Sequence, residues 1–187
     1  MATVTLNLWL VRHGETDWSA GHRFCGWSDP PLSERGRVQA MALRSEFEGR
    51  TFDSVVSSTS LRAIETARLA YGEPRPDERL RELDFGDIEG TTWRGCSPEI
   101  KQALADYETF EAPNGETVVQ LIERVTGALC DLGPGSHLVV THGGVIRFLL
   151  GRAGITDYPA LASLSRARLT VDAADGSLVN CSAEQAG

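Results

Sequence analysis

Apolar residues along this chain fall into short runs that alternate with longer stretches of mixed character. The short runs at 4–11, 53–57 and 137–141 are rich in Val and Leu and predict strands. Helices are expected at 33–48, 60–71, 98–106 and 118–132, and from 143 to about 152. The segments 166–171 and 177–181 flank Asp175-Gly176 and predict a closing antiparallel hairpin.

Two of these helices carry specific signals. Ser33 is an N-cap residue and Gly49 a stop signal, and we expect Val38, Met41 and Ala42 to form the inner face between them. In the helix that starts near residue 118, apolar residues recur at positions i, i+3, i+4, i+7 and i+11, and Gly133-Pro134-Gly135 ends it. The stretch from 73 to 115 offers little pattern beyond the short helix near its end.

Strands that alternate with helices predict an α/β fold. We expect one domain over residues 1–187, a three-layer α/β/α sandwich with a mostly parallel central sheet and an antiparallel C-terminal edge. Ligands of such folds bind at the carboxyl ends of the strands. That rule selects three junctions, at 12–14, 57–62 and 141–143.

Composition narrows the class of protein. A length of 187 residues suits one hydrophobic core, and a net charge of −8 argues against a nucleic-acid partner, which needs a basic face. No apolar run reaches the roughly 20 residues that cross a bilayer, and the first residues lack a basic, cleavable leader. We therefore expect a cytoplasmic protein that does not bind membranes. The four cysteines contain no Cys-x-x-Cys pair and are expected to be buried free thiols.

The three junctions place two arginines and two histidines together. Arg12 and His13 end the first strand, Arg62 follows the second, and His142 follows the third. Helix N-termini and guanidinium groups both bind anions, so this combination predicts a site for a compact dianion. Each residue alone is more often structural than functional.

At these junctions the chain resembles the histidine phosphatase superfamily, in the branch of the cofactor-dependent phosphoglycerate mutases and their small phosphatase relatives. The resemblance runs from about residue 5 to about 150. It rests on LVRHGET at 10–16, Trp18, RF at 23–24, GW at 26–27, Asp29, PLS at 31–33, SSxxxRAxxTA at 57–67, LRExxFGxxEG at 80–90, GET at 115–117 and THGG at 141–144.

The resemblance implies a role for each matching residue. His13 is the nucleophile, Glu82 is the proton donor to the leaving group, and Arg12, Arg62 and His142 bind the phosphate. A neutral imidazole can attack phosphorus if its other ring nitrogen keeps a proton, which agrees with the first role. Glu82 has an alternative reading as a surface carboxylate paired with Arg79 or Arg81.

Three further expectations concern the site. Glu15 is expected to support the motif from outside, and His22 and His137 to be structural. Two arginines would repel a divalent cation, so we expect no metal and no other cofactor. The family often has an asparagine where this chain has Ser19, and one hydroxyl donor in its place predicts weakened but retained phosphate binding.

Three functions remain open at this point. The mutases of the family that this chain resembles have a basic segment after the motif that carries Glu82, whereas between Leu83 and Glu123 this chain has only Arg94 and Lys101 as cations. The resemblance therefore favours hydrolysis of a small-molecule phosphate ester over mutase-type phosphoryl transfer. Similar small phosphatases include α-ribazole-5′-phosphate phosphatases and broad-range phosphomonoesterases, for which Trp93, Tyr107 and Phe110 are candidate lid aromatics. The third reading is a catalytically silent interaction domain, disfavoured because all five motif residues are present. The protein is expected to be a monomer or a homodimer.

Overall fold

The computed structural model describes residues 5–155, 162–172 and 178–184. Its strands and α-helices follow in the order β1 (Thr5–Arg12), α1 (Asp17–Ala20), α2 (Glu34–Ala42), α3 (Arg44–Phe47), β2 (Ser54–Ser58), α4 (Leu61–Ala70), β3 (Arg75–Asp77), α5 (Pro98–Ala105), α6 (Val118–Cys130), β4 (Gly135–Thr141), α7 (Gly143–Arg152), β5 (Arg166–Asp172) and β6 (Leu178–Glu184). Four 3₁₀ turns lie within the described part of the chain, at Glu78–Leu80, Gly86–Ile88, Trp93–Gly95 and Tyr107–Thr109.

Within the described residues, six strands form one sheet in the order β3-β2-β4-β1-β5-β6. β1 and β4 are parallel neighbours that end together, with Arg12 opposite Thr141. β2 is parallel to both β3 and β4, whereas β5 is antiparallel to β1 and β6 to β5. The predicted mostly parallel sheet with an antiparallel C-terminal edge is therefore confirmed, although the predicted turn at 175–176 lies outside the described residues.

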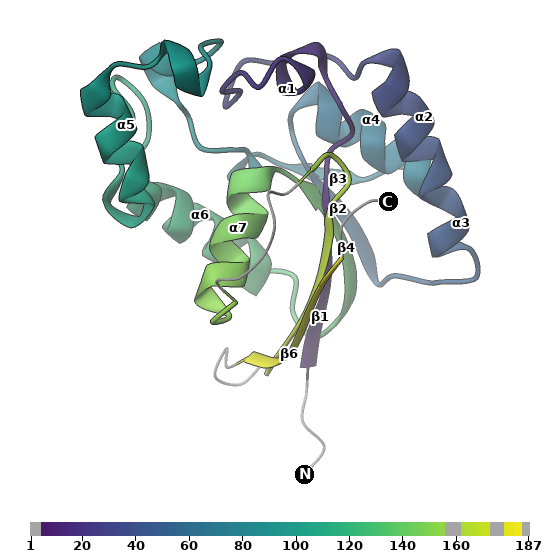
Figure 1. Ribbon diagram of the computed structural model, residues 1–187. Coiled ribbons are helices and arrows are strands. Elements are labelled where there is room, and N and C mark those ends of the chain that lie inside the picture. The colour runs from purple at the N-terminus through teal and green to yellow at the C-terminus, as the bar shows by residue number, and fades with distance from the viewer. Residues whose placement is uncertain (1–4, 156–161, 173–177, 185–187) are drawn as a thin grey trace.

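Helices cover both faces of the sheet, as Figure 1 shows, with α5, α6 and α7 on one side and α2, α3 and α4 on the other. Alternate residues of the central strands supply the two cores. Leu8 and Leu10 of β1 pack with α6 and α7, whereas Val11 packs with the helices of the opposite side. This three-layer arrangement confirms the predicted fold class and brings the carboxyl ends of β1 and β4 to one edge, next to α1.

The helix predicted over 33–48 differs from the structure in two respects. It is broken at Leu43 into α2 and α3. The predicted inner face is also wrong, because Val38 and Met41 are 61% and 50% exposed, and Ala42 is exposed as well. The buried face consists instead of Gly36, Ala40, Leu43 and Phe47. Small residues at 36 and 40 allow close packing, which a search for large apolar side chains does not detect.

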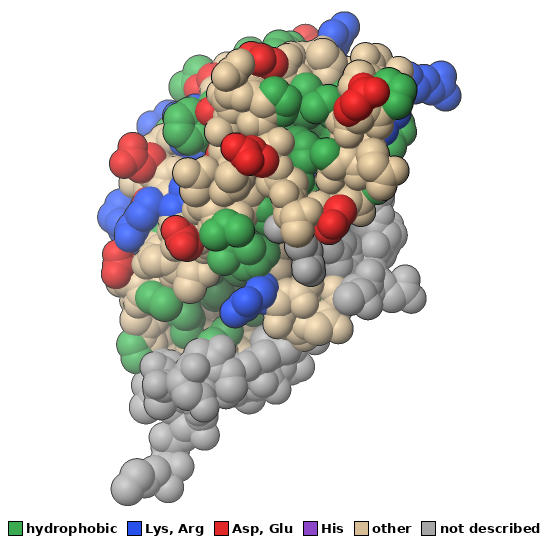
Figure 2. All heavy atoms as spheres, turned by 90° about the vertical axis from the view of Figure 1, so that its left-hand side faces the viewer, with side chains coloured by type: hydrophobic (Ala, Val, Ile, Leu, Met, Phe, Trp, Pro, Cys, Tyr) green, Lys and Arg blue, Asp and Glu red, His purple; other side chains and the backbone are tan. Residues whose placement is uncertain are grey.

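On the face that carries α5, α6 and α7, acidic and basic side chains are both scattered among apolar ones (Figure 2). No helix in the described ranges has both the length and the apolar character to span a membrane.

Candidate active site

His13 follows β1 directly and is held in one tautomer by its own loop. Its backbone amide donates to Thr141 O at 2.9 Å, which continues the pairing of β1 with β4. Its Nδ1 lies 2.7 Å from Gly14 O. Since a carbonyl can only accept, Nδ1 carries the proton, and Nε2 keeps a lone pair.

The charge state of His13 agrees with this tautomer. Burial, followed by the positive charges of Arg62 and Arg12, holds the pKa of His13 well below its usual range. The ring is therefore neutral at physiological pH. A neutral imidazole with a fixed Nδ1 proton is a nucleophile at Nε2.

The loop after His13 is packed so closely that two glycines are needed. A Cβ at Gly14 would lie 2.7 Å from Gly36 O, and one at Gly36 would lie 2.1 Å from Glu15 O. The amide of Gly14 donates to Thr66 Oγ1 at 2.9 Å, and that hydroxyl donates to Arg62 O at 2.6 Å. The start of α2 and the interior of α4 thus hold the carbonyl that orients His13.

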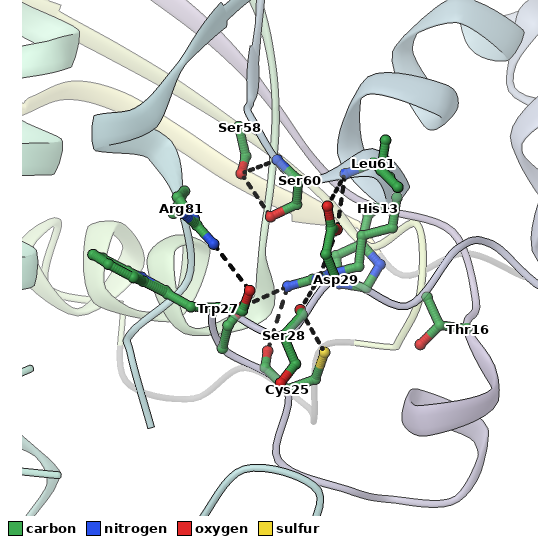
Figure 3. Close-up of polar contacts among 12 residues, drawn as sticks. His13, Thr16, Cys25, Trp27, Ser28, Asp29, Ser58, Ser60, Leu61 and Arg81 are labelled. Atoms are coloured by element: carbon green, nitrogen blue, oxygen red, sulfur yellow. Dashed lines mark hydrogen bonds and ion pairs between the residues drawn. The ribbon is translucent and has the colours of Figure 1, made fainter. Parts of the chain in front are cut away.

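Arg62 and His142 lie behind His13 and are fully buried. Arg62 donates to Ser28 O and Gly26 O, both at 2.8 Å, and lies 3.5 Å from a carboxylate oxygen of Asp29. Asp29 also accepts from the amide of Leu61 at the start of α4 (Figure 3). Arg62 therefore fixes the loop at 26–29 against α4.

His142 connects Arg62 to the β2 end of the site. Its Nδ1 lies 3.4 Å from a terminal nitrogen of Arg62, and its Nε2 lies 2.8 Å from Ser58 Oγ. Its ring is edge-on to that of His13, with 5.2 Å between the centroids. Burial, then the charge of Arg62, holds the pKa of His142 well below its usual range.

A cavity of about 380 Å³ opens in front of His13. Its lining comprises Arg12, His13, Thr16, Ser19, Arg23, Phe24, Cys25, Glu82, Phe85, Trp93, Leu104, Tyr107, Gly143, Gly144 and Arg147. The structure thus brings four predicted site residues, Arg12, His13, Ser19 and Glu82, to one cavity. Arg62 and His142 are outside its lining.

Glu82 points to the N-terminus of α7, and its alternative reading as a surface carboxylate is wrong. The side chain is buried, and its carboxyl oxygens accept from Leu83 N at 3.0 Å and Gly144 N at 2.8 Å. Arg79 pairs instead with Asp77 and Asp131. Arg81 donates to Trp27 O, as Figure 3 shows. These contacts leave Glu82 facing the cavity together with His13.

Ser19 lines the cavity, but its hydroxyl already has partners. It accepts from Thr16 N at 2.9 Å and donates to Thr16 O at 3.0 Å, as part of a capping box on α1. A hydroxyl has one proton to donate, so a hydrogen bond to phosphate requires this one to break. Phosphate binding by Ser19 stays a prediction.

The remaining expectations for the site have mixed outcomes. Glu15 accepts from Ser33 Oγ at 3.0 Å, and His137 contacts Ser54 Oγ and Gly133 O. Trp93 and Tyr107 line the cavity, whereas Phe110 belongs to the core.

Among the described residues no cluster of His, Cys, Asp and Glu has the arrangement of a metal site.

The prediction of buried thiols holds for only one of the described cysteines. Cys96 is buried, Cys25 is partly buried and Cys130 is exposed; the side chain of Cys181 lies outside the described part. Burial raises the pKa of Cys25 to about 11, so this thiol in the cavity wall is protonated at neutral pH.

Sequence reasoning missed several cavity residues. Arg147 shares a face of α7 with Gly143, at i and i+4, and that spacing was the available signal. Arg23 bridges to Thr92 through the backbone and donates to Gly90 O at 2.6 Å, a contact that no sequence pattern announces. The cavity wall therefore carries two arginines to which the sequence analysis assigned no role: Arg23, which lies in a quoted motif, and Arg147, which lies outside the motifs.

Known proteins share both sequence and fold with this chain. The family model described as "Histidine phosphatase superfamily (branch 1)" matches residues 8–179. A protein of Cronobacter sakazakii named "Probable phosphoglycerate mutase GpmB" is 36% identical over 84% of this chain and 78% of its own length. "Phosphoglycerate mutase-like protein 4" of Arabidopsis thaliana is 36% identical over 77% of this chain and 69% of its own.

Solved structures agree with these relatives. A crystal structure of a phosphoglycerate mutase from Thermus thermophilus has a TM-score of 0.77 and 36% identity, over 96% of this chain and all of that one. Bacillus stearothermophilus YhfR has a TM-score of 0.81 and 30% identity, over 97% of this chain and 98% of its own.

Proposed function

Because the chain belongs to the histidine phosphatase superfamily, whose members are phosphoryl-transfer enzymes, we propose that it hydrolyses small-molecule phosphate monoesters through a phosphohistidine at His13. One observation carries the proposal. His13 is buried and neutral, its Nδ1 proton is held by Gly14 O, and it lines the same cavity as Glu82 and Arg12.

In the first step, Nε2 of His13 attacks phosphorus while the bond to the ester oxygen breaks. Glu82 gives its proton to that oxygen, so that the alcohol leaves neutral. Arg12, which runs along the start of α7, offsets the charge that builds on the phosphoryl oxygens. Arg62 and His142, behind His13, complete the proposed phosphate site. His142 reaches phosphate only by exchanging a present hydrogen bond, whereas Nε of Arg62 makes no hydrogen bond within the described residues.

In the second step, water attacks the phosphohistidine and the P–N bond breaks. Glu82, now a carboxylate, takes the proton that the water gives up. Inorganic phosphate leaves, and His13 returns to its neutral form with the Nδ1 proton in place.

Hydrolysis is favoured over mutase-type transfer by where the cations lie. A mutase must retain the dephosphorylated intermediate until the phosphoryl group is returned. Neither Arg94 nor Lys101 lines the cavity, and the Lys101 ammonium donates to Arg94 O. The mutase function is the second candidate, because Arg23 and Arg147 do line the cavity and curated relatives carry that name.

The leaving group is an organic alcohol with an apolar or aromatic part. The cavity far exceeds the size of a phosphate, and Phe24, Phe85, Trp93, Leu104 and Tyr107 form the apolar part of its wall. Aromatic walls of this kind bind rings by stacking and edge contacts. α-Ribazole-5′-phosphate fits this description, as do aryl and alkyl phosphates hydrolysed by a broad-range enzyme.

A substrate panel tests the proposal. The purified protein is incubated with α-ribazole-5′-phosphate, a series of alkyl and aryl phosphates, and 3-phosphoglycerate, and both inorganic phosphate and 2-phosphoglycerate are measured. Phosphate release from esters other than 3-phosphoglycerate supports the phosphatase. Formation of 2-phosphoglycerate faster than phosphate release would establish the mutase instead.

The silent-domain reading has its own test. Glu82→Gln protein is exposed briefly to 4-nitrophenyl phosphate and examined by mass spectrometry for a phosphohistidine at residue 13, with His13→Ala as the matched control. Absence of the adduct in both variants, together with no turnover by the wild type, would refute catalysis.

A further inference from the structure

Arg124, in the middle of α6, donates hydrogen bonds to the backbone of the segment that carries Glu82. One terminal nitrogen donates to Arg79 O at 2.8 Å and to Arg81 O at 2.7 Å, and the other donates to Glu82 O at 2.8 Å. The planar guanidinium thus spans three carbonyls at once, which a lysine ammonium cannot do with the same geometry.

Glu116 fixes Arg124 from the opposite side. Its two carboxylate oxygens accept from Nε and a terminal nitrogen of Arg124 at 2.6 and 2.7 Å, a bidentate pair. Both side chains are largely buried, at 17% and 10% exposure. The backbone of Glu116 also bonds to the segment, since its amide donates to Asp84 O at 3.0 Å. The pair is therefore anchored to the same stretch of chain that it supports.

Two more side chains complete this support. Thr141 Oγ1 donates to Leu80 O at 2.8 Å, and Trp27 Nε1 donates to Glu82 O at 3.1 Å. All four carbonyls from residue 79 to residue 82 consequently accept from side chains that lie outside the segment. Buried carbonyls need such partners wherever no neighbouring strand supplies them, and here Arg124 supplies three of the five hydrogen bonds.

We propose that Arg124, held by Glu116, is the positioning residue of the general acid in the proposed phosphatase reaction, on which this inference rests. The backbone of Glu82 is set by Arg124, and its carboxyl group is set by the amides of Leu83 and Gly144. Arg124 is not in the cavity lining, so it reaches the acid step through Glu82 and not by contact with the substrate. A displacement of about 1 Å at a catalytic group costs on the order of a hundredfold in rate.

The test uses the leaving group as a reporter of the acid. An alkoxide needs a proton to leave, whereas 4-nitrophenolate does not, so a displaced Glu82 slows the first reaction selectively. Arg124→Lys keeps the positive charge but loses the planar guanidinium group that donates to the three carbonyls. We expect phosphohistidine formation in single-turnover kinetics to fall about 10- to 100-fold with an alkyl phosphate. With 4-nitrophenyl phosphate we expect a loss of less than about threefold, in keeping with a leaving group that needs little acid assistance.

Two controls accompany this variant. Arg79→Lys alters the same segment at a side chain that is 36% exposed and pairs with Asp77 and Asp131, and both rates should stay within about twofold of the wild type because the positive charge is kept. The double variant Arg124→Lys with Glu82→Gln should be no slower on the alkyl ester than Glu82→Gln alone, because residues that act as a unit are not additive. The amplitude of the phosphohistidine burst counts the folded sites in every variant.

The outcomes distinguish a failure of the positioning role of Arg124 from a failure of the proposed phosphatase function. Equal losses on both substrates in Arg124→Lys, beside a selective loss in Glu82→Gln, overturn the positioning role and leave the proposed function standing. Equal losses in Glu82→Gln itself overturn the acid and this inference together. If Arg124→Lys gives no burst, Glu116→Gln, which removes the charge that holds Arg124, is measured in its place with the same expected selectivity.

Discussion

The hydroxyl of Thr66 links His13, the proposed nucleophile, to helix α4, and replacing this hydroxyl tests that link. Thr66 is fully buried in α4, accepts from the amide of Gly14 and donates to Arg62 O. Thr66→Val replaces the hydroxyl by a methyl group of the same shape. Arg62 O keeps its helical hydrogen bond, because the amide of residue 66 is its i+4 partner. The amide of Gly14 loses its partner in a buried place.

The cost of this change follows from the structure. A buried amide without an acceptor costs about 1–3 kcal/mol, and 1 kcal/mol shifts Tm by about 2–4 °C in a chain of this size. We therefore expect Tm to fall by about 2–12 °C. Without its hydrogen bond to residue 66, Gly14 is less well fixed, and its carbonyl oxygen is a poorer acceptor for the Nδ1 proton of His13. Loss of a hydrogen bond worth about 0.5–1.5 kcal/mol lowers kcat/KM about 2- to 13-fold.

Thr66→Ser is the matched control for these measurements. It keeps the hydroxyl and loses only a methyl group, at about 1 kcal/mol of stability. Its kcat/KM should stay close to that of the wild type while that of Thr66→Val falls, with Tm followed by circular dichroism. A valine variant with unchanged kcat/KM and a Tm within about 1 °C of the wild type would refute the link.

Three further outcomes are expected. Activity should persist in excess chelator, and vanadate should inhibit competitively; a loss of activity that a divalent metal restores would contradict the metal-free mechanism. Because the pKa values of His13 and His142 are lowered in the folded state, the unfolded chain binds more protons below about pH 6.5, so the free energy of unfolding should decrease as the pH falls from 7 towards 5. The decrease is at most about 1.4 kcal/mol per pH unit for each histidine, and urea titrations that show a flat profile would contradict it. Gly36→Ala should destabilise the protein by about 1–3 kcal/mol, because its Cβ meets Glu15 O. Gly127→Ala inside α6 should stabilise it by up to about 1 kcal/mol, because its Cβ makes only an ordinary contact with Arg79 at 3.9 Å; equal shifts in Tm would rule out the close contact at Gly36.

Much of the fold follows from local signals in the sequence. The strand that ends at Arg12 and the helix capped by Thr117 both have clear apolar patterns and lie where expected. The buried face of α2 could not be predicted in this way. It is set by the contact between Gly36 and the backbone of Glu15, a residue that is remote in sequence. Small residues give no hydrophobic signal, so the pattern favoured Val38 and Met41 as the buried face, although both are exposed.

The candidate site shows the same division. Motif order predicts which residues meet near His13, but not which of them face the cavity and which stand behind it. The terminal nitrogens of Arg62 donate to Gly26 O and Ser28 O, contacts that no motif indicates, and phosphate binding by Arg62 stays a prediction. Arg124 was not predicted, because its partners are backbone carbonyls, and these have no signature in the sequence. Contacts to the main chain are the part of the site that sequence reasoning does not reach.

The position of β1 at the centre of the sheet has a consequence for synthesis on the ribosome. Both of its neighbours, β4 and β5, come late in the chain. After His13 emerges, roughly 120 residues must be added before β4 begins, which takes about 6–24 s at about 5–20 residues per second. Throughout that time Leu6, Leu8 and Leu10 belong to a nascent strand with unpaired edges, which is the kind of segment that aggregates or binds chaperones. His13, the proposed nucleophile, is thus translated near the beginning of the chain and acquires its surroundings only near the end of translation.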